Sequence, residues 1–108
     1  MTNPTLLAAA ALVQRGWCQK TYSLYHATSA AEYCAIGAIG HTLFIREPQT
    51  QIEWGDLHNS KYARALKKIL ARHYSPEDTD ITEWNDNVAE SAAEVAYMLI
   101  LAAEELTL

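Results

Sequence analysis

The chain has 108 residues, half of them apolar and 18 of them alanine, which predicts one domain, residues 1–108, with a core of small side chains. Four glycines, three prolines and a charged content of 19% exclude a collagen-like or wholly disordered chain. The net charge of −5 argues against direct binding to nucleic acid, which needs a broad basic surface. The lack of a long apolar run and of a basic signal-peptide flank, together with only two cysteines, favours a non-membrane protein of the reducing cytoplasm.

The first helix is expected over residues 4–15. Asn3 precedes Pro4, a pair typical of a helix start, because the Asn side chain accepts a hydrogen bond from an unpaired N–H and proline has no N–H to satisfy. Gly16 predicts that this helix ends in a left-handed conformation, which glycine adopts without steric cost.

A second helix is expected over residues 29–45. It would open with the capping box Ser29-Ala30-Ala31-Glu32, in which the first and last side chains bond to backbone N–H groups of the first turn. Gly37 and Gly40 would each cost about 1 kcal/mol relative to alanine inside a helix, so their presence indicates close backbone packing against a neighbour.

Two further helices are expected over residues 58–73 and 91–106. The apolar stripe of the third helix ends at His73, and the fourth helix opens with a second capping box, Ser91-Ala92-Ala93-Glu94. Residues 81–84 are the one strand-like stretch.

These patterns predict an all-α, compact four-helix domain with functional loops after the first helix and before the fourth. The expected core consists of Leu7, Val13, Ile36, Leu43, Leu66, Ile69, Val95 and Leu99, with Trp17 and Trp84 closing the loops.

Three segments contain residue combinations that helix formation does not require. They are Gly16-Trp17-Cys18-Gln19, Tyr33-Cys34-Ala35-Ile36-Gly37-Ala38-Ile39 and Trp84-Asn85-Asp86. With these segments the chain resembles the domain-of-unknown-function family numbered 6197, small proteins of bacteria and their phages. The resemblance covers nearly the whole chain and implies a fold type but no activity. Many members of that family have glycine after the Gln, whereas Lys20 follows Gln19 here, so this residue does not itself predict a tight turn.

Trp17, Gln19, Trp84, Asn85 and Asp86 form the candidate recognition site. An indole platform beside short polar side chains is suited to stacking and hydrogen bonding with a small nucleotide-like ligand, at the interface of a possible homodimer. The alternative interpretation is structural: Asn and Asp close turns, while each Trp enters the core.

The charges are segregated along the chain. Residues 49–73 have a balance of +3, whereas residues 74–108 contain no Lys or Arg. That last segment contains nine acidic residues: Glu77, Asp78, Asp80, Glu83, Asp86, Glu90, Glu94, Glu104 and Glu105. Either these carboxylates face the basic helix and water, or they form a surface that docks on a basic partner.

The leading hypothesis for function is a small, acidic, non-enzymatic binding protein, an inhibitor or regulator of the phage counter-defence kind. It would dock on a basic surface of a host protein, with Glu77, Asp78 and Asp80 among the contacting residues. The first alternative is a binder or sponge for a nucleotide signal, using the candidate recognition site.

The second alternative is a thiol-dependent enzyme in which Cys34 is the nucleophile, Cys18 its resolving partner and His26 or His41 its base. A helix start lowers a thiol pKa, but buried cysteine is also a common small core residue. No paired carboxylates, Ser–His set or metal-ligand spacing is present, so we expect no catalysis, no cofactor and no metal site.

Overall fold

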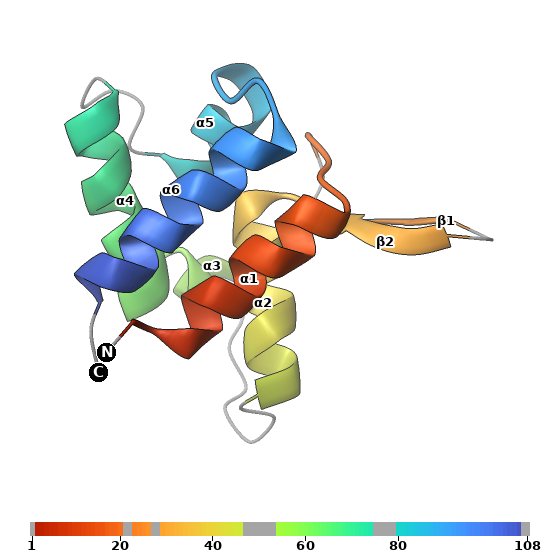
Figure 1. The fold of residues 1–108 in the computed structure, drawn as a ribbon, viewed down its shortest axis with the longest axis horizontal. Coiled ribbons are helices and arrows are strands. Elements are labelled where there is room, and N and C mark those ends of the chain that lie inside the picture. Colours follow the sequence, from red (N-terminus) through yellow and green to blue (C-terminus); the bar gives the residue numbers. More distant parts are fainter. Residues whose placement is uncertain (1, 21–22, 27–28, 47–53, 75–79, 107–108) are drawn as a thin grey trace.

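The computed structural model describes residues 2–20, 23–26, 29–46, 54–74 and 80–106 (Figure 1). The elements in chain order are α1 (Pro4–Arg15), β1 (Ser23–His26), β2 (Ser29–Tyr33), α2 (Ala35–Arg46), α3 (Trp54–Leu57), α4 (Lys61–His73), α5 (Ile81–Asn87) and α6 (Ala92–Glu105). Within these residues the protein is mainly helical, which confirms the all-α class. The expected four helices are too few, because α5 and the single turn α3 add to α1, α2, α4 and α6.

The centre of the fold is the pair α1 and α6, which lie side by side in opposite directions in Figure 1. The start of α1 meets the end of α6, where the Asn3 N–H donates to the Ala103 carbonyl over 2.9 Å. α2 packs against α1, and α4 packs against α6. The antiparallel hairpin β1–β2 projects from one side of this helical layer.

Side-chain caps fix the starts of three of the expected helices. The Asn3 Oδ1 accepts from the Leu6 N–H over 3.0 Å at the start of α1. Ser60 and Ser91 accept in the same way at the starts of α4 and α6, over 3.2 and 3.1 Å. Each such cap contributes about 1 kcal/mol. The Glu94 carboxylate returns to the Glu90 N–H rather than to that of Ser91, so the second capping box forms in a modified version.

The expected helix start at Ser29 is wrong. Residues Ser29–Tyr33 form strand β2, and α2 begins only at Ala35. Backbone pairing explains the difference. This segment pairs with β1. In addition, the Tyr33 N–H donates to the Gly16 carbonyl over 2.9 Å, and the Tyr33 carbonyl accepts from the Cys18 N–H over 3.2 Å. These partners satisfy the backbone groups as a helix would.

The strand-like stretch 81–84 is also a wrong prediction, because it forms the first turn of α5. Asp80 caps this helix, its Oδ1 accepting from the Glu83 N–H over 3.0 Å. Gly16 ends α1 in an extended conformation, φ −173°, and not in the left-handed one, because the chain continues directly into its pairing with Tyr33.

The core prediction is correct except at Leu7. Val13, Ile36, Leu43, Leu66, Ile69, Val95, Leu99 and Trp84 are buried, and Trp17 is half-buried against them. Leu7 is 40% exposed, because α1 turns the neighbouring Leu6 into the core instead. His73 is exposed at the last turn of α4 and is not part of the buried stripe.

Candidate functional site

The two segments of the candidate recognition site meet at a buried side chain, Asn85 of α5. Its Oδ1 accepts from the Trp17 indole N–H over 2.8 Å and from the Ala35 N–H over 3.0 Å. Its Nδ2 donates to the Cys18 carbonyl over 3.1 Å. Asn85 is only 1% exposed. Its hydrogen bonds connect α5 to the segment that follows α1 and to the start of α2, and we call this set of contacts the Asn85 junction.

Gln19 closes the end of α5. Its Nε2 lies 3.0 Å from the Asn85 carbonyl, 3.2 Å from the Asp86 carbonyl and 3.5 Å from the Ala89 carbonyl. The last carbonyls of a helix have no partners within the helix, and a side-chain donor satisfies them. Gln19 thus acts as a cap for α5, from a segment far away in the sequence.

Lys20 adopts a left-handed conformation, φ 69°, the one positive φ of a non-glycine residue in the described part of the chain. Its N–H donates to the Asp86 Oδ1 over 2.7 Å, and the same oxygen accepts from the Asn85 Nδ2 over 3.1 Å. The left-handed conformation at this position therefore forms without glycine. The left-handed backbone costs about 1 kcal/mol in a residue with a Cβ, and the bond to Asp86 offsets part of that cost.

Trp84 is fully buried. Its ring centroid lies 5.8 Å from that of Tyr74, with the two planes at 60°, and its indole N–H has no hydrogen-bond partner among the described residues. A ligand cannot stack on an indole that the core covers. Of the five residues of the candidate recognition site, the structure brings Trp17, Gln19, Asn85 and Asp86 into one hydrogen-bonded network, and it places Trp84 in the core beside them.

The two cysteines lie close together, are buried and form no disulfide. Burial raises the pKa of the Cys34 thiol to about 11, against small opposing effects of backbone hydrogen bonds from Gly37 and Ile36. Burial also raises the pKa of Cys18, helped by the charges of Glu32 and Asp86. Both thiols are protonated at neutral pH, whereas a nucleophile needs the thiolate.

Of the two histidines expected to act as a base, His41 makes no contact with Cys34 among the described residues. The ring of His41 lies 4.8 Å from that of Tyr33. The side chain of His26 lies outside the described residues. The described residues contain no group of three His, Cys, Asp or Glu side chains suited to a metal ion. None of their helices is long and apolar enough to cross a membrane.

The acidic segment divides between two ends of the molecule. At the end formed by α5 and the start of α6 lie five carboxylates, which we call the acidic face: Asp80, Glu83, Asp86, Glu90 and Glu94. Asp80, Glu83 and Glu90 are exposed, whereas Asp86 and Glu94 are half-buried. Glu94 also accepts from the Tyr74 hydroxyl. Glu77 and Asp78 lie outside the described residues.

At the other end of α6, Glu105 forms an ion pair with Arg72 of α4, through two hydrogen bonds of 3.0 and 2.9 Å. These hydrogen bonds lower the pKa of the Glu105 carboxyl and raise that of Arg72. Here the acidic segment does face the basic helix, as the simpler interpretation of the charge segregation expected.

Sequence reasoning missed a hollow on α4. It is lined by Lys61, Arg64, Ala65, Lys68, Glu105 and Leu106. The spacing of the α4 residues, one and two turns apart, shows that they share a face of the helix. No local pattern of residues indicates that the end of α6 lies against that face.

These features define the class of protein: a small helical domain in which a Gly-Trp-x-Gln turn is hydrogen-bonded to a Trp-Asn-Asp helix. The chain belongs to the family described as "Family of unknown function (DUF6197)", which matches residues 3–105. The match spans the fold from the cap of α1 to the last residue of α6, and it confirms the resemblance carried by the three segments. No curated protein and no solved structure matches the chain.

Proposed function

We propose that this protein is a non-enzymatic binding protein that docks through its acidic face on a basic surface of another protein. The observation that carries the proposal is the concentration of five carboxylates over α5 and the start of α6, in a segment without Lys or Arg. Carboxylates gathered on one face steer a basic partner toward it and increase the rate of encounter.

The contacts at the Asn85 junction support binding at the surface rather than at the candidate recognition site. The amide of Asn85 has both its oxygen and its nitrogen in hydrogen bonds within the chain. The Gln19 Nε2 is likewise directed to carbonyls of the chain. These groups hold the fold together, so a ligand would have to break existing bonds in order to use them.

The state of the thiols supports a role without catalysis. A Cys34 pKa of about 11 leaves very little thiolate at neutral pH. The free cysteines fit a reducing compartment such as the cytoplasm. Within this proposal, the protein is an inhibitor or regulator of the counter-defence kind, and its target is a nucleic-acid-handling protein, whose surface is basic.

The test compares charge reversals on the acidic face with a charge reversal at the far end of α6. Glu83→Lys and Glu90→Lys change the acidic face, whereas Glu104→Lys makes the same charge change at an exposed position on the far end of α6. Each variant is immobilised and exposed to host lysate. We expect wild type and Glu104→Lys to capture the same protein, and Glu83→Lys and Glu90→Lys to capture less of it.

The salt dependence of capture gives a second criterion. Since exposed charges are screened over about 10 Å at 0.1 M salt, capture by wild type should weaken as the ionic strength rises. Equal capture by all four proteins, or capture that does not depend on salt, would contradict the proposal.

A further inference from the structure

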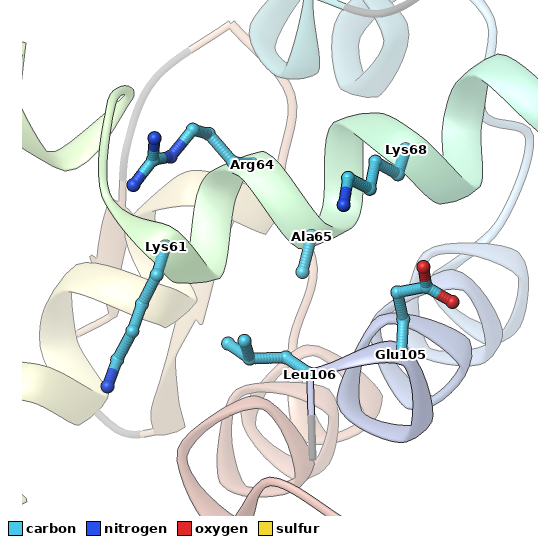
Figure 2. Close-up of a pocket in the computed structure, with 6 residues that line it drawn as sticks. All are labelled: Lys61, Arg64, Ala65, Lys68, Glu105 and Leu106. Atoms are coloured by element: carbon cyan, nitrogen blue, oxygen red, sulfur yellow. The ribbon is translucent and has the colours of Figure 1, made fainter. Parts of the chain in front are cut away.

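The hollow on α4 has a volume of about 260 Å³ and lies between one face of this helix and the end of α6. Figure 2 shows Ala65 and Leu106 facing each other across it, with Lys68 and Glu105 toward one side and Lys61 toward the other. Ala65 is 5% exposed and Leu106 half-buried, so the floor is apolar. The rim carries the charges. The volume is just below the range of about 300–1,000 Å³ typical of small-molecule sites, which indicates a compact ligand.

Three cations line the hollow, and they differ from the other basic residues of α4. Lys67 donates to the His58 carbonyl over 2.9 Å, and Arg72 is paired with Glu105. Lys61, Arg64 and Lys68 are exposed, and none of them forms an ion pair within 4.0 Å in the described part of the chain. Lys61 has one contact of another kind, with its ammonium 5.3 Å from the centre of the Tyr62 ring.

The one carboxylate in the lining does not neutralise these cations. Glu105 accepts hydrogen bonds from the Arg72 guanidinium with both its oxygens and also attracts Lys68, so one carboxylate is shared between two cations. The position of Lys61 and Arg64 adds to the excess of positive charge around the hollow. Both lie at the start of α4, which has no acidic residue in its first turn, although the positive end of a helix dipole favours anions there. The hollow is therefore a place of uncompensated positive charge on an otherwise acidic protein.

We propose that this hollow binds a small organic phosphate, a ligand with one phosphate group and a compact apolar part. The phosphate oxygens would accept hydrogen bonds from Lys61, Arg64 and Lys68, while the organic part would lie on Ala65 and Leu106. In Figure 2 the Arg64 guanidinium and the Lys61 ammonium both extend away from Lys68, and these exposed side chains must rotate to reach the same anion. The site is separate from the acidic face, which lies at the opposite end of α6.

The test uses phenyl phosphate as probe, with phenol and inorganic phosphate as its two parts, and follows backbone amide shifts by NMR at 150 mM salt. We expect phenyl phosphate to shift amides of residues 61–68 and 105–106 in a saturable way. Phenol should produce no such shifts, and inorganic phosphate should bind more weakly because it lacks the apolar part. If inorganic phosphate and phenyl phosphate bound with equal affinity, the proposed apolar contact would be contradicted.

The variant Lys61→Gln/Lys68→Gln removes two cations from the rim, and Arg15→Gln/Arg46→Gln removes the same charge from exposed sites on α1 and α2. Loss of charge-assisted hydrogen bonds should weaken binding about tenfold or more in the first variant, with little change in the second. All four positions are exposed, and thermal unfolding by circular dichroism checks that both variants fold. Equal weakening in the two variants, or no saturable shift with any probe, would overturn the proposal.

Discussion

The Asn85 junction and the acidic face are both polar, and the structure uses their side chains in opposite ways. At the junction, Asn85, Gln19 and the Lys20 N–H meet groups of this chain over 2.7–3.2 Å, and the central side chain is 1% exposed. On the acidic face, Glu83 and Glu90 extend into solvent. A buried polar group stabilises a fold only when every partner is present, whereas an exposed carboxylate contributes little to stability and remains available to a partner. Changes at the junction should therefore affect folding, and changes on the face should affect binding.

The largest effect is expected from Trp84→Ala. This side chain is fully buried in the core beside Tyr74, and its truncation leaves a large cavity. The free energy of unfolding should fall by about 3–5 kcal/mol, measured by urea denaturation. A loss below about 1 kcal/mol would indicate that the indole is not packed as described and is open to a ligand.

Asn85→Ala should follow, with a loss of about 3 kcal/mol, because it leaves the Trp17 indole N–H, the Ala35 N–H and the Cys18 carbonyl without their partner. Asn87→Ala is the matched control on the same helix. Its side chain is exposed, so the variant should change stability by no more than about 0.5 kcal/mol. Similar losses in both variants would show that α5, and not the junction, is responsible.

Cys34→Ser tests the buried thiol. We expect a loss of about 1–2 kcal/mol at neutral pH, because a hydroxyl replaces a thiol in an apolar site. The pH dependence has a defined sign. The pKa of Cys34 rises from its ordinary value of 9.0 to about 11 on folding, so its contribution to stability is complete below pH 9.0 and is lost as the pH rises toward about 11.

The difference between wild type and Cys34→Ser in denaturation at a series of pH values isolates this contribution. Wild type should lose stability more steeply than the variant between these two values. Parallel curves would mean that the thiol is not held protonated, and the thiol-enzyme hypothesis would then regain support.

Lys20→Gly should give the smallest effect and the opposite sign. Glycine adopts φ 69° without a Cβ penalty and keeps the N–H that donates to Asp86. The folded state gains about 1 kcal/mol from relief of strain and loses part of it to the greater freedom of glycine in the unfolded chain. A small rise in the thermal midpoint is expected, and Lys20→Ala should give none.

The start and end of α1, α4 and α6 could be predicted from local signals, but one pair of identical segments shows the limit. Ser-Ala-Ala-Glu occurs at residues 29–32 and 91–94. The second segment caps α6, whereas the first lies in strand β2, because β1 and the extended segment 16–18 provide backbone partners that only the folded chain brings near. Local capping is worth about 1 kcal/mol and yields to such pairing.

The candidate recognition site could be predicted in part. The sequence singled out Trp17, Gln19, Asn85 and Asp86 as one group, and the structure does bring them together. Whether these side chains bind a ligand or form hydrogen bonds with one another depends on distances that no sequence pattern gives. The α4 hollow was not predictable for a similar reason. Its basic residues were visible, but the role of Glu105 depends on its pairing with Arg72 across two helices.

The most direct test of docking through the acidic face is site-specific photocrosslinking at two matched positions. A photoreactive amino acid replaces Glu83 in one protein and Glu104 in another, both exposed, and each protein is irradiated with host lysate. The account predicts a crosslink to one basic protein from position 83 and none from position 104, with the yield falling as salt is added. Crosslinks of equal yield from both positions, or from position 104 alone, would contradict it.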